Sequence, residues 1–272
     1  MKRSEYLIAF KNRTFSDEEA IGRVWDVENI KNLIGRFFYY EAANEREAVM
    51  NDLWVSEAEN LASASFGRNW GFIEGKDKIQ AYYIGKNRFG AVGTSISHPF
   101  TTKLVCLAED GKTAQGIWMG NGYETAPNAE GHLEAAWINE RMAVDFIKEA
   151  DGWKIWHMFI GTNFVCPVGT SYADQPIITE KHAYRDGNPA WYMVGKGKEI
   201  MEADVAVFDQ IPTYPEREVF TPTIPCDAYT ALYNDQIAFP QLPVDYRSFA
   251  DTTAYNYSGF CAVCGNSMGR VL

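Results

Sequence analysis

The sequence predicts an α+β fold in which a cone-shaped, curved antiparallel sheet is packed by three helices and followed by a long C-terminal extended arm. Residues 30–40 carry apolar side chains at helical spacing, and two long strand pairs follow one another between residues 101 and 165. A helix first and hairpins last is an order typical of a sheet that curves over one helix. Because such a cone encloses a pocket, we expect a small-molecule site.

The three helices are predicted in the first third of the chain. Ser16 and Glu19 have the spacing of a capping box, which indicates a helix start, and apolar residues recur at helical spacing from 27 to 40. A second capping pattern predicts a short helix within residues 44–53, and residues 75–84 predict the third helix.

The strands are predicted from alternating apolar residues and from turn signals. The two hairpins pair residues 101–108 with 113–123, and residues 133–149 with 153–165. The second hairpin turns at Asp151-Gly152, and an Asp-Gly pair between alternating segments is a strong short-range hairpin signal. Residues 58–73 are expected to add two short strands.

The composition changes after about Pro167, where prolines gather and periodicity fades. A disordered tail is poor in aromatic residues, whereas this segment is rich in Tyr, Phe and Trp. We therefore predict a pocket domain over residues 1–170 and an ordered arm over residues 171–272. The arm is expected to pack on the core or on a neighbouring subunit, which predicts a homo-oligomer that uses the sheet and the arm.

The charge balance excludes several classes of partner. The formal net charge is −11, and Lys and Arg form no run, so nucleic-acid and anionic-membrane binding are not expected. The N-terminal apolar run is too short for a signal peptide, and no segment is long enough to span a bilayer. Five scattered cysteines, an odd number, favour a reducing compartment, and we expect a cytoplasmic protein.

Metal and cofactor motifs are also missing from the sequence. Cys261 and Cys264 form a lone C-x-x-C pair without the second pair that a structural zinc site needs, and we interpret them as chance neighbours in the arm. The chain lacks a dinucleotide fingerprint, a phosphate loop and a nucleophile elbow. No metal and no cofactor are expected.

Over residues 27–165 this layout resembles the SnoaL-like branch of the nuclear transport factor two-like superfamily. The resemblance rests on the opening helix at 30–40, the middle helix at 75–83 and the closing hairpin at 150–155. It implies the cone fold, but the superfamily includes dehydratases, isomerases, cyclases and pure binding proteins, so the fold does not choose a reaction.

Within the superfamily the chain looks most like scytalone dehydratase and the bile-acid dehydratases, which use Tyr, Asp and His to remove a proton and expel water. The resemblance places the His role on His98. The Tyr and Asp positions correspond to Phe37 and Ala42, which cannot do acid–base work, so the chain departs from the pattern there. Tyr40 and Glu41 lie close by and can substitute.

Three residues are the candidate catalytic groups. His98 titrates near neutrality and is expected to move the proton; the alternative is a structural or surface His. Asp145 can tune or assist His98 if its face of the strand is the inner one; otherwise it belongs to a solvated ion pair. Tyr40 can polarise a substrate oxygen, or else it is core packing.

Further residues are candidates for lining the pocket, each with packing or solvent exposure as the alternative reading. His157 is placed on one face with Trp153, Ile155 and Phe159 by simple alternation, from which it can reach His98. Gly120 and Gly122 permit a bulge or a close approach of a ligand. The full set of expected pocket residues is Glu41, Phe37, Trp118, Asn121, Tyr123, Arg141 and His157.

The expected function is cofactor-independent acid–base chemistry on a hydrophobic cyclic or aromatic small molecule. A dehydratase or hydratase comes first, and an isomerase next. The alternatives are a non-catalytic small-molecule-binding protein and an accessory subunit of a larger enzyme assembly. A catalytic protein is expected to bring His98 and a carboxylate together.

Overall fold

The computed structural model of this chain describes residues 14–68, 71–85, 95–127, 133–169, 171, 242, 243, 245–249 and 255. The helices are α2 (Asp17–Ala42), α3 (Arg46–Ala48), η1 (Val49–Leu53), α4 (Ala58–Leu61) and α5 (Lys76–Gly85). The strands are β1 (Ser65–Arg68), β2 (Gly71–Glu74), β3 (Ser95–Ser97), β4 (Phe100–Leu107), β5 (Thr113–Pro127), β6 (Leu133–Glu149) and β7 (Gly152–Pro167).

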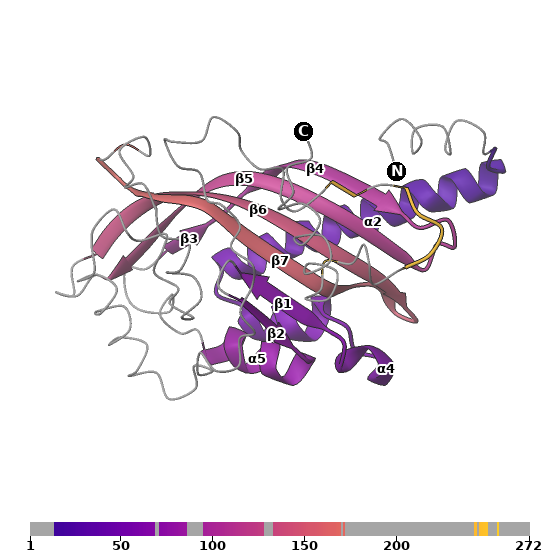
Figure 1. Cartoon of the computed structure of the whole chain (residues 1–272), viewed down its shortest axis with the longest axis horizontal. Coiled ribbons are helices and arrows are strands. Elements are labelled where there is room, and N and C mark those ends of the chain that lie inside the picture. The colour runs from indigo at the N-terminus through magenta and orange to yellow at the C-terminus, as the bar shows by residue number, and fades with distance from the viewer. Residues whose placement is uncertain are drawn as a thin grey trace, which may run out of the picture.

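The described strands form one sheet in the order β2-β1-β7-β6-β5-β3, and β4 pairs with β5 beside β3. The long strands β5, β6 and β7 curve together, with α2 lying along one face of the sheet (Figure 1). The α+β class is therefore confirmed. The sheet is mixed rather than purely antiparallel, because β1 runs parallel to β7.

One helix, α2, contains both the helix start predicted at Ser16 and the apolar spacing predicted from 27 to 40. Its N-terminus is capped by Ser16, whose Oγ accepts a hydrogen bond from the Glu19 amide at 3.2 Å, as the capping box predicts. Its buried side chains follow the helical spacing i, i+3, i+4, i+7 and are Ile30, Leu33, Ile34 and Phe37. This single apolar stripe presses the helix against the sheet.

The shorter elements agree with the sequence in part. The predicted third helix is α5, which starts after Gly75 at a φ of +91°. The predicted short helix over residues 44–53 divides into α3 and η1. Two short strands form at β1 and β2, but residues 58–61 are helical instead of extended, so that part of the strand prediction was wrong.

The sheet has two unlike faces. On β6, Met142, Val144 and Phe146 belong to the main core with α2, and we name their side the helix face. Side chains alternate along a strand, so Ala143 and Asp145 point to the opposite side. We name that side the arm face, because described residues of the C-terminal arm contact it.

The contacts of the arm are local and specific. Tyr246 Oη donates to Thr113 Oγ1 at 3.0 Å, and the Tyr255 amide donates to Asp145 Oδ2 at 2.6 Å. The Phe249 ring packs against Trp156 at a centroid distance of 4.6 Å. Most of residues 171–272, including Cys261 and Cys264, lie outside the described residues, so the predicted domain division stays a prediction.

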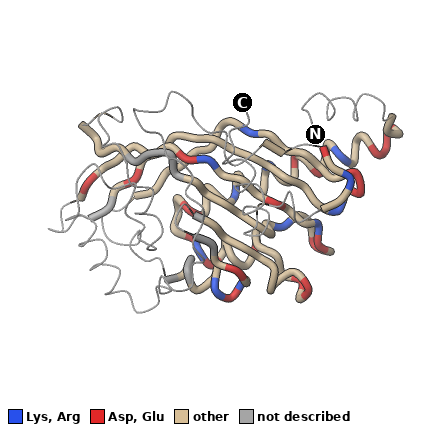
Figure 2. Tube along the Cα trace, viewed as in Figure 1, with Lys and Arg blue, Asp and Glu red and all other residues tan. Residues whose placement is uncertain are grey.

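Charged residues concentrate at the ends of elements. In the described part of the chain, Asp, Glu, Lys and Arg gather at hairpin turns and helix ends, while long stretches of the strands are uncharged (Figure 2). A charged side chain in the middle of a long strand is therefore a notable feature of this molecule.

No helix among the described residues is both long and apolar enough to cross a membrane.

Candidate functional site

His98 lies at the junction between β3 and β4, directly on β5. Ser97 pairs with Tyr123 and Phe100 pairs with Gly120, so residues 98–99 cross over Gly122. A Cβ built on Gly122 would come within 2.7 Å of the His98 Cα, and one on Gly120 within 2.8 Å of the Phe100 Cα. The sequence suggested a bulge or a close ligand approach at the two glycines, and the group that approaches them in the structure is the chain's own β3–β4 junction.

Two carboxylates flank the His98 ring. His98 Nδ1 lies 3.0 Å from Glu140 Oε2, and His98 Nε2 lies 3.8 Å from Glu124 Oε2. Glu140 is opposite Gly120 on the neighbouring strand, and Glu124 lies two residues beyond Gly122 on β5. All of these positions share the register of Trp118 and Met142, so the cluster is on the helix face.

The three side chains of this cluster are largely buried, which restricts the states in which their charges are stable. The Glu140 side chain is only 2% exposed, while His98 and Glu124 keep 16% and 13%. A buried carboxylate is costly unless it is paired, and Glu140 meets this requirement through His98. A ring whose Nδ1 is held by a carboxylate has a fixed orientation.

The C-terminal turns of α2 lie next to this cluster. Phe38 stacks on Phe100, with ring centroids 4.7 Å apart and planes 10° apart. Tyr40 is partly buried against the core. Glu41, with a side chain 14% exposed, lies 3.8 Å from Arg46 Nη1. The helix end that carries Tyr40 and Glu41 therefore faces the strand that begins two residues after His98.

Phe37 and Trp118 are core residues on the helix face. Each is 2% exposed, and both belong to the main apolar cluster. Trp118 packs edge-on against Phe146 at 5.9 Å and also lies over Gly116. They build the apolar floor beside the cluster.

Asp145 does not lie beside His98. Five residues separate it from Glu140 along an unbroken stretch of the β5–β6 ladder, and an odd separation puts the two on opposite faces. Asp145 instead pairs with His157, with Oδ2 2.8 Å from Nδ1, and Oδ1 accepts a hydrogen bond from Gln115 at 2.7 Å. The expected contact between Asp145 and His98 was wrong.

His157 is on the arm face as well, because β7 contains a bulge. The register passes from Asp145 opposite His157 to Phe146 opposite Ile155, so Trp156 is an extra residue. A bulge inverts the alternation that follows it. His157 therefore shares a face with Phe159 and not with Ile155, and the expected reach from His157 to His98 across the sheet was wrong.

Other residues expected in the pocket also lie away from the cluster. Asn121, Tyr123 and Arg141 occupy odd positions on the β5–β6 ladder and hence the arm face. Tyr123 is 48% exposed and meets Trp137 edge-on at 6.5 Å, and Asn121 Oδ1 accepts a hydrogen bond from Asn139 at 2.6 Å. The structure does not bring these three together with His98.

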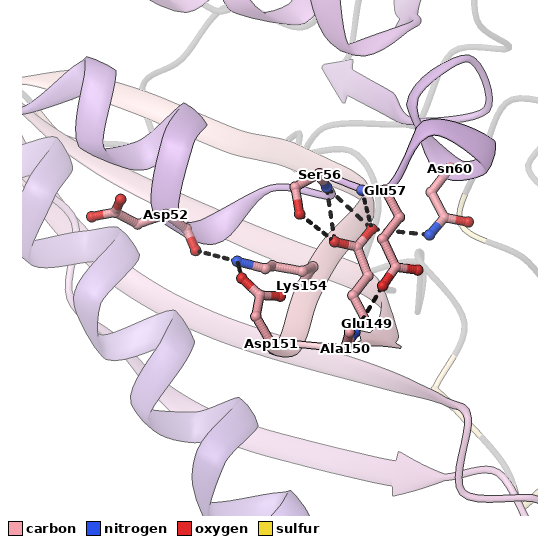
Figure 3. Close-up of polar contacts among 8 residues, drawn as sticks. All are labelled: Asp52, Ser56, Glu57, Asn60, Glu149, Ala150, Asp151 and Lys154. Atoms are coloured by element: carbon pink, nitrogen blue, oxygen red, sulfur yellow. Dashed lines mark hydrogen bonds and ion pairs between the residues drawn. The ribbon is translucent and has the colours of Figure 1, made fainter.

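Glu149 forms a second dense polar cluster at the β6–β7 turn (Figure 3). Its carboxylate accepts hydrogen bonds from the Ser56 amide and hydroxyl, the Glu57 amide and Asn60 Nδ2, at 2.7 to 3.1 Å. Burial alone would raise the pKa of Glu149, but these hydrogen bonds outweigh it and lower the pKa. The donors come from the first turn of α4 and the residues before it, so Glu149 fastens that helix to the hairpin.

Glu140 and Glu124 were not among the site residues predicted from the sequence. A signal was present, because Glu140 continues the apolar series of Met142, Val144 and Phe146 at a spacing of two. A carboxylate in the apolar register of a strand indicates a buried, paired charge. Glu124 likewise follows Gly120 and Gly122 at the same spacing.

Comparisons with known proteins agree with this architecture. Residues 22–158 match the SnoaL-like domain. The chain belongs to the SnoaL-like family. The family resemblance expected from the sequence is thereby confirmed. A search among curated proteins finds no match to this chain.

Several solved structures are similar to this SnoaL-like chain in fold. One is an NTF2-like protein with a cystatin-like fold from Novosphingobium aromaticivorans, 18% identical, covering 59% of this chain and 96% of its own, with a TM-score of 0.41. Another is a hexachlorocyclohexane dehydrochlorinase from Novosphingobium barchaimii, 13% identical, covering 58% and 99%, with a TM-score of 0.44. A protein of unknown function from Mycobacterium tuberculosis is 12% identical, covering 76% and 98%, with a TM-score of 0.46.

Proposed function

We propose that this protein is a cofactor-independent acid–base enzyme, first a dehydratase or hydratase and next an isomerase, acting on a hydrophobic cyclic ketone or hydroxy ketone. The observation that carries the proposal is the His98–Glu140 pair, with its 3.0 Å contact on the helix face. A His held by a buried carboxylate is suited to removing a proton next to a carbonyl.

The surroundings of the pair favour an apolar substrate. Phe38, Phe100 and Trp118 place aromatic rings on the same side of the sheet as His98, and the carboxyl groups of Glu140 and Glu124 flank its ring. Because Glu140 and Glu124 place carboxyl groups on both sides of the His98 ring, an anionic substrate is disfavoured. A neutral ring that bears a carbonyl group fits both conditions, and Tyr40 is the candidate for polarising its oxygen.

Hydrogen exchange tests this function without knowledge of the natural substrate. The protein is incubated with α-tetralone, a neutral bicyclic ketone, in deuterium oxide, and deuterium at the carbon next to the carbonyl is followed by NMR. We expect the wild type to accelerate exchange. Replacing His98→Gln is expected to remove at least about 100-fold of that acceleration, the lower end of the usual contribution of a positioned base.

The control is Glu28→Gln, which changes an exposed carboxylate on α2 that pairs with Lys31. This variant is expected to exchange at the wild-type rate. Equal exchange by wild type and His98→Gln would overturn the proposed function.

A binding protein is the second candidate function. It is favoured by the absence of an acid–base residue at Phe37 and Ala42 and by the apolar floor that Phe37 and Trp118 build. Retention of α-tetralone with no acceleration of exchange would support binding without catalysis.

A further inference from the structure

We propose that the side of α2 turned away from the sheet is a self-association surface, on which two copies of this chain pair their α2 helices antiparallel. The inference goes beyond the proposed function, because it assigns a partner, a second copy of the chain, to a surface that lies outside the sheet. We name this surface the outer face of α2. Its exposed residues are Ile21, Val24, Trp25, Glu28, Asn32, Gly35, Arg36 and Tyr39.

The N-terminal half of α2 exposes apolar side chains that no core covers. Ile30 is the first buried residue of the helix, whereas Ile21, Val24 and Trp25 are 71%, 64% and 68% exposed. Their spacing of three and four residues puts them on one side of the helix. The N-terminal turns of α2 reach beyond the ends of the strands (Figure 1). A cluster of large apolar side chains held in water in this way marks an interaction surface.

The same half of the helix is fixed from its sheet side. Arg23 donates from its two Nη atoms to the carbonyl oxygens of Ala108 and Leu107, at 3.0 and 3.1 Å. Asp26 Oδ1 accepts a hydrogen bond from Trp153 Nε1 at 2.9 Å. A partner therefore meets a surface that is already ordered, which reduces the entropy lost on binding.

The outer face is complementary to itself about the level of Ile30. Ile21 and Tyr39 are equally far from Ile30 along the chain, and so are Trp25 and Gly35. Two antiparallel copies centred at this level place each Ile21 against Tyr39 of the other copy, and each Trp25 against Gly35. A Cβ built on Gly35 meets nothing within 4 Å, so the position leaves room for an indole ring. Such a two-fold contact, in which one surface meets itself, is the commonest form of homodimer.

Arg36 adds an electrostatic match to this contact. It is exposed, and it lies as far from Ile30 as Val24, the neighbour of Trp25. Antiparallel pairing therefore brings the guanidinium group of each copy beside the indole ring of the other, an arrangement that attracts a cation to an aromatic face. Because both halves of the match stand on one helix, a second copy fits this face better than an unrelated partner does.

The size of the outer face predicts a modest affinity. Trp25 is 68% exposed and Tyr39 is 73% exposed, so each can bury on the order of 150 Å². With Ile21 and Val24, two copies bury roughly 1,000 Å² in total, which is at the low end for specific interfaces. We therefore expect a dimer with a dissociation constant in the micromolar range.

The first test is the size of the full chain in solution. Sedimentation velocity is measured at about 100 µM, a concentration at which a micromolar dimer is largely formed. We expect the wild type to associate and Trp25→Glu to lose this association. The matched control is Trp137→Glu, which changes an exposed tryptophan of the arm face and is expected to keep the wild-type size. Circular dichroism checks that both variants are folded.

Each other outcome overturns the helix contact. A wild type that does not associate, or a folded Trp25→Glu of wild-type size, would show that α2 carries no self-association. A Trp137→Glu protein smaller than the wild type would place the contact on the arm face of the sheet instead, which is where the sequence predicts an oligomer contact.

The second test is the orientation of the pair. Glu28 and Asn32 are equally far from Ile30, so antiparallel helices bring Glu28 of one copy next to Asn32 of the other. Glu28→Cys and Asn32→Cys proteins are oxidised separately and as a mixture, beside the wild type as the background for its own cysteines. We expect the mixture to form a disulfide between position 28 of one chain and position 32 of the other, identified by peptide mass spectrometry. Predominant disulfides between equal positions would overturn the antiparallel arrangement, and no disulfide above the background would overturn the contact itself.

Discussion

A row of buried polar residues crosses the arm face, and its members differ in how well they are satisfied. Ser65, His157, Asp145 and Gln115 are register neighbours on β1, β7, β6 and β5. Asp145 accepts from three sides, through His157, Gln115 and the Tyr255 amide. In contrast, Ser65 Oγ is buried and makes no hydrogen bond within the described part of the chain.

Ser65→Ala is therefore expected to stabilise the protein. Removing a buried hydroxyl that has no partner should raise the free energy of unfolding by about 1 kcal/mol. The matched control is Ser56→Ala, which removes a hydroxyl that donates to Glu149 Oε2 at 2.7 Å and should cost about 2 kcal/mol. Urea unfolding of the two variants checks the opposite signs. A loss of stability in Ser65→Ala would show that the hydroxyl does have a partner in the folded protein.

Glu149 should make stability depend on acid. Its pKa is lowered in the folded state, so its contribution is fully present above its unfolded pKa and is lost as the pH falls through the folded value. Glu149→Gln removes the charge that the four donors require and should cost about 2 kcal/mol at neutral pH. Below pH 4.5, the ordinary pKa of a glutamate, the difference in the free energy of unfolding between wild type and Glu149→Gln should become smaller.

The measurement is the free energy of unfolding at a series of pH values from neutral to acid. Glu59→Gln, at an exposed position on the same helix α4, is the control and should keep the same gap to the wild type throughout. A difference in the free energy of unfolding between wild type and Glu149→Gln that does not change with pH would contradict the lowered pKa of Glu149.

At the scale of elements, the position of His98 depends on Gly120 and Gly122, which leave room on β5 for the β3–β4 junction. Gly122→Ala would drive a Cβ into the His98 backbone and ring, so the β3–β4 junction must shift away from β5. We expect a loss of about 1–3 kcal/mol in stability from overpacking. Displacing His98 from Glu140 by about 1 Å should also cost roughly 100-fold in α-tetralone exchange.

Gly35→Ala is the matched control for this change. Gly35 is exposed on α2, and a Cβ there meets nothing within 4 Å. Alanine has the higher helix propensity, so this variant should gain about 1 kcal/mol and keep full exchange. Wild-type exchange in Gly122→Ala would show that the position of His98 does not depend on the close approach.

Local signals made the elements predictable, while a single bulge on β7 hid the face that His157 occupies. The Asp151-Gly152 turn and the Ser16 cap are read from neighbouring residues, and both were confirmed. The face of His157 depends on the extra residue Trp156, and a bulge has no reliable signature in one strand, because it is a mismatch between two. Simple alternation beyond that point gave the wrong face.

The partners of His98 were hidden for a different reason. Glu140 and Glu124 reach His98 only through the β5–β6 register and the crossing at Gly122, which join residues far apart in the chain. From the sequence, either face of this strand could be the inner one, and Asp145 was the carboxylate expected to assist His98. Face assignment, rather than distance along the chain, decides between Glu140 and Asp145.

At the scale of the whole molecule, the sheet separates two histidine–carboxylate pairs. His98–Glu140 faces the α2 side and keeps some exposure, whereas Asp145 and His157 are both fully buried on the arm face. Residues near the C-terminus seal the second pair, through the Tyr255 amide and the Phe249 ring. We infer that the His98–Glu140 pair takes part in the reaction and that the Asp145–His157 pair holds the arm to the sheet.

Asp145→Ala and Glu140→Ala should therefore fail in different ways. Asp145→Ala leaves His157 buried without its carboxylate and frees the Tyr255 amide, so it should cost about 3–5 kcal/mol and raise amide hydrogen exchange at residues 246–249 and 255. If the variant is kept below its unfolding midpoint, its α-tetralone exchange should stay close to that of the wild type, because His98 lies on the other face. Glu140→Ala should instead lose exchange of α-tetralone by roughly 100-fold without a rise in amide exchange at residues 246–249 and 255. On the same samples, mass spectrometry measures amide exchange of the protein, and NMR measures deuterium exchange of α-tetralone.

If Asp145→Ala lost α-tetralone exchange while amide exchange on the helix face stayed unchanged, the two histidine–carboxylate pairs would be coupled through the sheet.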